Sequence, residues 1–105
     1  MARWVEVPGA PGLAPGGMCA VAVGDAGILL ARCEDGWHAI EDRCSHDDGP
    51  LGEGRLVGCE VECPRHGARF DVRDGRVTRM PAVSPVRSFP VREEGGRVFV
   101  DAEAL

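Results

Sequence analysis

Short runs of alternating apolar and polar residues, separated by frequent turn signals, dominate the chain. Residues 97–101 are the clearest run, because Val98 and Val100 alternate with neighbours that suit the opposite face of a strand. Turn-forming pairs such as Asp74-Gly75 recur at intervals too short for typical helices. The pattern predicts an all-β protein, with strands expected over residues 4–7, 18–23, 28–32, 37–40, 56–62, 68–72, 76–80, 88–92 and 97–101.

Residues 8–17 interrupt this pattern. Pro8, Pro11 and Pro15 can neither propagate a helix nor complete the hydrogen-bond ladder of a sheet, so we expect a connecting loop there. The chain has 105 residues, of which 44% are hydrophobic and 28% charged, as is typical of one folded domain with a modest core. A single domain over residues 1–105 is therefore predicted.

Charge and apolar patterning narrow the possible partners. Seventeen acidic residues outnumber twelve basic ones, and no segment concentrates arginine as a nucleic-acid-binding surface does. The first residues contain no apolar stretch suited to a signal peptide or a membrane span, so we expect a cytoplasmic protein that binds neither nucleic acid nor membrane. In that compartment, five cysteines favour metal or redox chemistry over a disulfide framework.

Two short segments each combine a cysteine with a histidine. They are Cys44-Ser45-His46 and Cys63-Pro64-Arg65-His66, with sixteen residues between them. Two loops could therefore close on one metal group. Gly49 and Gly67 follow the histidines and would let the backbone turn tightly beside that group.

This ligand set is compatible with two kinds of metal site. Zinc binds sulfur and nitrogen readily, but its commoner sites take two cysteines from one loop and two histidines from the other. Each loop here is mixed. A Rieske centre fits better, because two histidines replacing two cysteines on one iron of a 2Fe-2S cluster define that centre.

The segments CSHDDGPLGEG and CPRHGARFDVRDG resemble the cluster-binding region of Rieske proteins, close to the ferredoxin components of bacterial ring-hydroxylating dioxygenases. The motif covers residues 44–75, and residues 81–100 resemble the proline loop and final hairpin of the family. The resemblance implies a Rieske fold, with an antiparallel sandwich or barrel and a small cluster-binding subdomain over about residues 42–80. It also implies one Rieske-type 2Fe-2S cluster, with Cys44 and Cys63 on the inner iron and His46 and His66 on the outer iron.

The chain departs from the high-potential members that it resembles. Those proteins carry an extra cysteine in each loop that forms a bracing disulfide, where this chain has Asp48 or Gly49 and Arg65. They also present serine and tyrosine hydroxyls to the sulfurs, where this chain has Ala68 and Phe70. Hydrogen bonds to sulfur raise the potential, so we expect roughly −150 to 0 mV, the lower part of the Rieske range.

The resemblance implies an electron carrier that passes single electrons from a reductase to a terminal oxygenase, with both proteins as partners. We expect a monomer, because nothing in the sequence marks an exposed self-complementary surface. A catalytic oxygenase subunit would need two further histidines and a carboxylate for a mononuclear iron, and only His38 is left. We therefore expect no enzyme activity of its own. The alternatives are a small Rieske subunit of a larger reductase, such as nitrite reductase, and a zinc-stabilised interaction module.

The remaining cysteines and histidine are expected to have structural roles. Cys19, Cys33 and Cys59 lie in or directly beside predicted strands and suit small buried apolar positions, with at most one disulfide among them. His38 is expected to be an ordinary strand residue.

Overall fold

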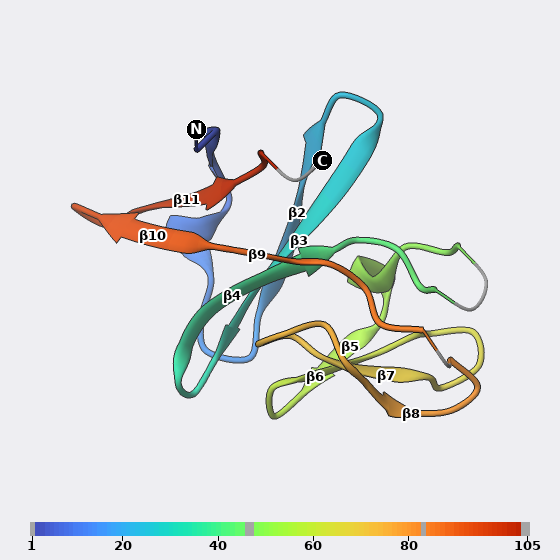
Figure 1. Ribbon diagram of the computed structural model, residues 1–105. Coiled ribbons are helices and arrows are strands. Elements are labelled where there is room, and N and C mark those ends of the chain that lie inside the picture. The colour runs from blue at the N-terminus through green and yellow to red at the C-terminus, as the bar shows by residue number, and fades with distance from the viewer. Residues whose placement is uncertain (1, 46–47, 83, 104–105) are drawn as a thin grey trace.

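The computed structural model describes residues 2–45, 48–82 and 84–103 (Figure 1). The structure is almost entirely β, as predicted. Its strands are β1 (Trp4–Glu6), β2 (Met18–Val23), β3 (Ala26–Cys33), β4 (Gly36–Glu41), β5 (Arg55–Val57), β6 (Glu60–Glu62), β7 (Arg69–Asp71), β8 (Val77–Arg79), β9 (Ser88–Phe89), β10 (Val91–Glu94) and β11 (Arg97–Asp101), with 3-10 turns η1 (Ala10–Gly12) and η2 (Leu51–Glu53). Within the described residues, no helix is long and apolar enough to cross a membrane.

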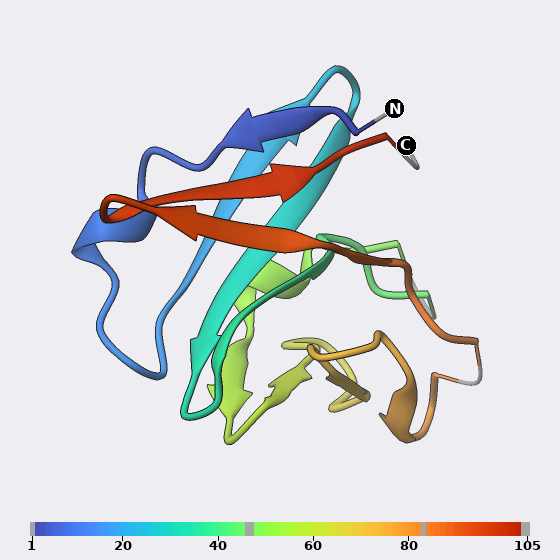
Figure 2. The same ribbon diagram turned by 60° about the vertical axis from the view of Figure 1, so that its left-hand side comes forward.

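The strands form three antiparallel sheets. A terminal sheet has the order β1-β11-β10, a central sheet the order β2-β3-β4-β9, and a small sheet the order β5-β6-β7-β8. Figures 1 and 2 show the central sheet between the other two, with the small sheet on the side away from the chain termini. This architecture matches the expected combination of a larger antiparallel assembly with a smaller β region.

Strand β3 explains why the central sheet lies in the middle. Ile28 and Leu30 point into one apolar cluster, which they share with Val98 and Val100 of the terminal sheet. Leu29 and its alternate neighbours point into a second cluster, which reaches the small sheet. A strand buried on both faces reads as a continuous apolar run, as residues 28–31 do. The core therefore has two layers that share β3.

Two expected strands are each divided in the structure. The expected strand over 56–62 is a hairpin, in which β5 and β6 pair on either side of Gly58 and Cys59. Gly58 has φ +64°, a left-handed conformation that reverses the chain. The expected strand over 88–92 is interrupted at Pro90, which lacks the N–H needed for the ladder and separates β9 from β10.

The segment after β8 is held against the small sheet at Gly75. The Val86 N–H donates to the Gly75 carbonyl at 2.9 Å. A Cβ at position 75 would lie 2.0 Å from the Val86 carbonyl oxygen, so only glycine fits there. Ala82 and Val86 are buried in the same apolar cluster as Phe70. The proline-containing segment is thereby fixed along one side of the small sheet.

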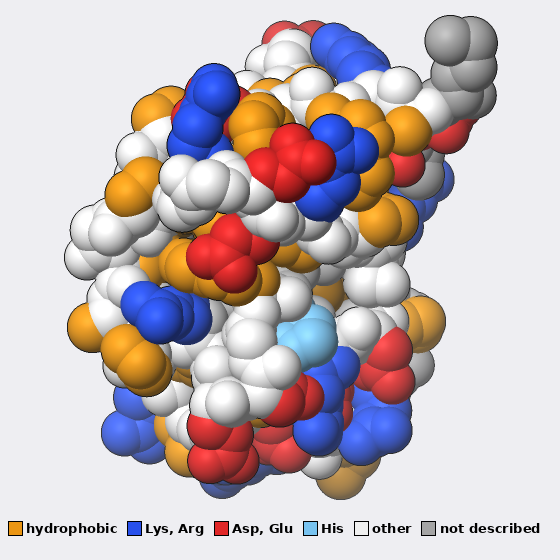
Figure 3. Space-filling model, turned by 90° about the vertical axis from the view of Figure 1, so that its left-hand side faces the viewer, with side chains coloured by type: hydrophobic (Ala, Val, Ile, Leu, Met, Phe, Trp, Pro, Cys, Tyr) orange, Lys and Arg blue, Asp and Glu red, His pale blue; other side chains and the backbone are white. Residues whose placement is uncertain are grey.

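The surface mixes both signs of charge. On the face shown in Figure 3, acidic and basic side chains lie interspersed among apolar and neutral ones. Several are paired in the structure, including Arg97 with Glu6 at 2.7 Å.

Candidate iron-sulfur site

Two predicted ligands, Cys44 and Cys63, have buried side chains and lie in the segments that follow β4 and β6. Cys44 follows β4 and is 0% exposed, and Cys63 follows β6 and is 1% exposed. Both belong to the apolar cluster between the central and small sheets. The disulfide of the structure uses other cysteines and leaves these two as thiols. The fold thus presents two thiols suited to metal binding from one side of the core.

The two loops that begin at these cysteines have the same hydrogen-bond frame. In the first loop, residues 44–49, the Cys44 N–H donates to the Gly49 carbonyl at 2.8 Å, and the Asp48 N–H donates to the Cys44 carbonyl at 2.8 Å. In the second loop, residues 63–68, the Cys63 N–H donates to the Ala68 carbonyl at 2.7 Å. The Gly67 N–H closes that loop onto the Cys63 carbonyl at 3.1 Å. The loops are therefore built alike around each cysteine.

The tight turn of each loop occurs at its fifth residue. Gly67 has φ +76°, as expected for the second loop. In the first loop the left-handed residue is Asp48, with φ +63°, so the expectation that Gly49 makes this turn is wrong. Aspartate tolerates this conformation better than most residues do. Arg43 also holds the Asp48 carboxylate with a 2.7 Å hydrogen bond.

The histidines occupy different places in these matching frames. His66 is the third residue after Cys63, and its side chain is exposed. His46 is the second residue after Cys44 and lies outside the described residues. The structure thus places three of the four predicted ligands in the two loops. Cys44 and Cys63 are on the buried side, and His66 is on the solvent side.

The two loops border one pocket of about 230 Å³. Gly49 lines it from the first loop, with Pro50 directly after that loop, and Cys63, Pro64 and Arg65 line it from the second. Among the described residues, Cys63 is the predicted ligand that lines this pocket. Two buried thiols and one exposed imidazole on the two loops are a donor set that iron-sulfur clusters use. The residues present therefore fit a 2Fe-2S group of the Rieske kind.

The segment over residues 81–86 contacts the first loop directly. The Ser45 hydroxyl donates to the Ser84 carbonyl oxygen across this contact. Ala82 is 1% exposed, and Val86 is 7% exposed, so the segment also packs into the core. This placement supports the expectation that the proline segment covers one side of the site.

The two side chains at the positions of the family's hydroxyl donors, 68 and 70, are apolar. Ala68 and Phe70 are each 0% exposed and pack in the cluster that contains Cys44 and Cys63. These are the positions at which the resemblance places hydroxyl donors in high-potential proteins. Because neither side chain has a donor, neither can raise a potential by hydrogen bonding to sulfur.

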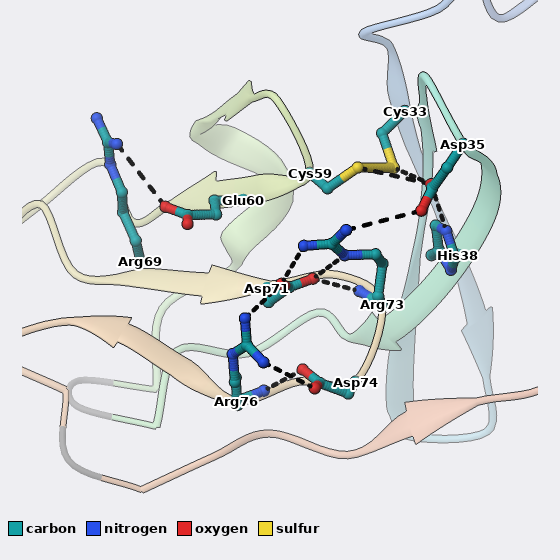
Figure 4. Close-up of polar contacts among 10 residues, drawn as sticks. All are labelled: Cys33, Asp35, His38, Cys59, Glu60, Arg69, Asp71, Arg73, Asp74 and Arg76. Atoms are coloured by element: carbon teal, nitrogen blue, oxygen red, sulfur yellow. Dashed lines mark hydrogen bonds and ion pairs between the residues drawn. A yellow bond between two sulfur atoms is a disulfide. The ribbon is translucent and has the colours of Figure 1, made fainter.

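Sequence reasoning missed a buried carboxylate in the small sheet. Asp71, at the end of β7, is 1% exposed and accepts hydrogen bonds from Arg73 at 2.8 and 3.0 Å and from Arg76 at 3.3 Å (Figure 4). The hydrogen bonds from the Arg73 guanidinium are the main reason that the pKa of Asp71 lies below its usual value. The sequence did contain a sign of this buried ion pair, because Asp71 is followed in the next turn by Arg73 and Arg76.

The structure corrects the expectation for two cysteines. Cys33 and Cys59 form a disulfide with a Cα–Cα distance of 5.4 Å, instead of packing as separate apolar side chains. The bond joins the end of β3 to the turn between β5 and β6, and so ties the central sheet to the small sheet. Cys19 remains outside it, in agreement with the expected limit of one disulfide.

Residues 3–90 match the Rieske 2Fe-2S domain family, and the chain belongs to this family. Within it, the chain is similar to ferredoxin components of ring-hydroxylating dioxygenase systems. It is 47% identical over 78 residues to the p-cumate 2,3-dioxygenase ferredoxin component of Pseudomonas putida, covering 72% of this chain and 66% of that protein. It is 43% identical over 91 residues to the biphenyl 2,3-dioxygenase ferredoxin component of Rhodococcus jostii, covering 87% and 85%.

A solved structure extends this likeness to almost the whole fold. A chain in the complex of reduced oxygenase and oxidized ferredoxin of carbazole 1,9a-dioxygenase superposes with a TM-score of 0.89 at 37% identity. The superposition covers 95% of this chain and 94% of that chain. The Rieske fold predicted from the motif is therefore confirmed.

Proposed function

We propose that this protein is a Rieske-type ferredoxin that accepts single electrons from a reductase and passes them to a terminal oxygenase. The observation that carries this proposal is the pair of matching loops, which hold two buried thiols against the core and leave His66 at the surface. The family and the dioxygenase ferredoxins among its relatives support it. The nitrite reductase and zinc-module alternatives have no observation that favours them over this reading.

The proposed ligands are Cys44, His46, Cys63 and His66, holding one 2Fe-2S cluster. The bound cluster would supply reversible one-electron chemistry. The backbone of each loop fixes the direction of its cysteine, because the cysteine N–H and carbonyl are both used in closing the loop. Such fixed ligands change little in geometry between two oxidation states, which keeps electron transfer fast.

The apolar cluster behind the cysteines excludes water from the inner side of the site. Leu51, Val61 and Phe70 are each 0% exposed there. Water and hydroxyl donors near sulfur raise a cluster's potential, so this lining supports the expected value of roughly −150 to 0 mV. A potential in that range suits an electron carrier for an oxygenase better than a subunit that oxidises quinol.

The exposed end of the second loop is the proposed contact with both redox partners. Pro64, Arg65 and His66 are all exposed, so a partner can approach the imidazole without any opening of the core. A single docking site implies that the reductase and the oxygenase bind in turn. We propose that the protein acts as a cytoplasmic monomer, which leaves this end open to each partner.

The chain is proposed to carry electrons without catalysing a reaction of its own. Its sequence has three histidines, and two are assigned to the cluster. The third, His38, cannot by itself form the two-histidine, one-carboxylate site of a non-haem iron oxygenase. Substrate oxidation is therefore assigned to the partner oxygenase.

A redox titration coupled to a transfer assay tests this function. The purified protein should take up one electron per chain reversibly, at roughly −150 to 0 mV. After reduction, it should be reoxidised by an oxidised oxygenase component of a ring-hydroxylating dioxygenase, with the matching appearance of reduced oxygenase. A protein that takes up no electron reversibly would contradict the proposal.

A further inference from the structure

A second group of metal-binding side chains lies outside the two cluster loops. Cys33 ends β3, Asp35 lies in the following turn, His38 is in β4, and Cys59 reaches them from the turn between β5 and β6 (Figure 4). The ligand atoms of Cys33, Asp35 and His38 lie within 4.8 Å of one another. Cys59 joins this group through its disulfide to Cys33.

One carboxylate oxygen is the centre of this group. Asp35 Oδ1 is 2.8 Å from His38 Nε2, 3.1 Å from Cys33 Sγ and 3.6 Å from Cys59 Sγ. In a tetrahedral zinc site with two sulfurs, one nitrogen and one oxygen, neighbouring ligand atoms stand about 3.3–3.8 Å apart. The distance from Asp35 Oδ1 to Cys59 Sγ lies within that range, and those to His38 and Cys33 are shorter, as hydrogen bonds are. The two sulfurs would have to separate, and Cys59 Sγ, which is not among the three ligand atoms within 4.8 Å of one another, would have to move towards His38.

We propose that Cys33, Asp35, His38 and Cys59 form a second metal site, which binds a divalent cation of the zinc class when the Cys33–Cys59 disulfide is reduced. Two thiolates and an imidazole select zinc over magnesium or calcium, which prefer oxygen ligands. The disulfide and the metal exclude one another, because the bonded sulfurs have no thiolate to offer. The site therefore has an oxidised form closed to metal and a reduced form open to it.

A dithiol reductant supplies the electrons and protons needed to reduce the Cys33–Cys59 disulfide. The dithiol gives two electrons and two protons to the S–S bond and becomes a disulfide itself, and Cys33 and Cys59 become thiols. Zinc then displaces one proton from each thiol as two Zn–S bonds form. The iron-sulfur cluster takes no part in either step.

The surroundings of Asp35 favour this role. Arg73 Nη1 lies 3.8 Å from the other carboxylate oxygen, Asp35 Oδ2. Arg73 is itself held by the buried Asp71, so its position is fixed (Figure 4). An outer partner of this kind orients a ligating carboxylate. Zinc with two thiolates and one carboxylate carries one negative charge, and it would lie beside the positive charge of Arg73, which also pairs with Asp71.

The site is also reachable from solvent. The side chains of His38 and Asp35 are 25% and 45% exposed, so a metal ion can enter from their side. Cys33 is 5% exposed and forms the inner wall. Cys59 lies in the two-residue turn between β5 and β6.

Zinc binding to the cluster-loaded protein tests the proposal. The protein is reduced anaerobically with dithiothreitol, desalted, given a small excess of zinc chloride and desalted again. Thiol counting confirms the reduction, and elemental analysis gives zinc and iron per chain. We expect one retained zinc per chain with unchanged iron, and no zinc on the disulfide form. The zinc K-edge X-ray absorption should show two sulfurs at about 2.3 Å and two lighter ligands at about 2.0–2.2 Å.

Matched variants assign the zinc to this site. Cys59→Ser should lose retained zinc, whereas Cys19→Ser, which changes a cysteine outside the disulfide, should keep it. His38→Gln should weaken zinc binding at least tenfold. The proposal is overturned if the reduced protein retains no zinc, or if the Cys59→Ser variant retains as much as the parent. Zinc that displaces iron would mark the cluster loops instead, and would equally overturn it.

Discussion

The central sheet and the small sheet are stabilised by different kinds of interaction. Strands β2, β3 and β4 have six, eight and six residues, and β3 buries apolar side chains on both faces. Each strand of the small sheet has three residues. Three-residue strands bury little apolar surface, and their ladders alone give marginal stability. The small sheet therefore depends on local ties, and the proposed cluster would be the strongest of them.

Apart from the buried apolar side chains of Val61 and Phe70, the contacts that hold the small sheet are polar or covalent. Asp71 is buried between two arginines, and Glu62 accepts hydrogen bonds from Arg69 and Arg55, which lower the pKa of Glu62. The Cys33–Cys59 disulfide adds a covalent link. The comparison predicts that damage at the site loosens the small sheet first, and leaves the central sheet folded.

The largest effect is expected from removing a ligand of the proposed cluster. His66→Ala should abolish the Rieske visible spectrum and lower hydrogen-exchange protection in β5 to β8, with β2 to β4 still protected. His38→Ala is the matched control and should keep the spectrum, because His38 lies outside the two loops. A His66→Ala protein with an unchanged spectrum would refute the ligand assignment.

Asp71→Asn is expected to cost about 1–3 kcal/mol of unfolding free energy, because it removes a buried charge and leaves two arginines without it. Chemical denaturation at pH 7 measures this cost. The exposed neighbour Asp74→Asn is the control, with an expected change within about 0.5 kcal/mol. Equal stability of the Asp71→Asn variant and the parent would contradict the proposed dependence on polar ties.

The difference in stability between the parent and the Asp71→Asn variant should depend on pH. Folding lowers the pKa of Asp71, so its contribution is fully present above the unfolded pKa of about 3.9 and is lost as the pH falls through the lower folded value. The stability gap between parent and Asp71→Asn should stay constant from pH 8 to about pH 5 and shrink only in stronger acid. A gap that closes between pH 7 and pH 6 would point to a different group.

Gly67→Ala is expected to cost about 1–2 kcal/mol, because the residue has φ +76° and only glycine adopts this conformation freely. A Cβ there would meet no atom within 4 Å, so the cost comes from the backbone alone. Gly12→Ala is the control, since that position is equally open and has no positive φ. Thermal unfolding of the two variants measures the difference, and an equal change in both would contradict the loop geometry.

The smallest effect is expected at the contact between the first loop and residues 81–86. Ser45→Ala removes the hydrogen bond to the Ser84 carbonyl and should cost about 0.5–1.5 kcal/mol. Hydrogen exchange should rise near residues 84–86 and stay unchanged in the central sheet. Ser88→Ala, on the exposed side of β9, is the control. Unchanged exchange in Ser45→Ala would show that the contact does not hold this segment.

The sequence was most informative where long-range burial and local pattern agree. Strand β2 and strand β11 have their predicted bounds, and Val98 and Val100 are buried as their alternation indicated. The pattern failed in the small sheet, where residues 56–62 look like one strand and Gly58 makes them a hairpin. Short strands carry too few alternating positions to reveal such a turn.

For the site, residue types were easier to predict than backbone details. The motif placed Cys44, Cys63 and His66 in two loops, as the structure does. It could not show that Asp48 takes the left-handed conformation, since glycine is the usual residue there and Gly49 was adjacent. The Cys33–Cys59 pairing also depends on how two sheets pack, which local sequence does not encode.

Electron paramagnetic resonance of the dithionite-reduced protein is the most direct test that Cys44, His46, Cys63 and His66 hold a Rieske cluster. The account predicts the signal with a low average g value that arises when histidines ligate one iron of a 2Fe-2S cluster, with intensity of about one spin per chain. A colourless, iron-free protein with no signal, or a signal typical of four-cysteine ligation, would contradict it.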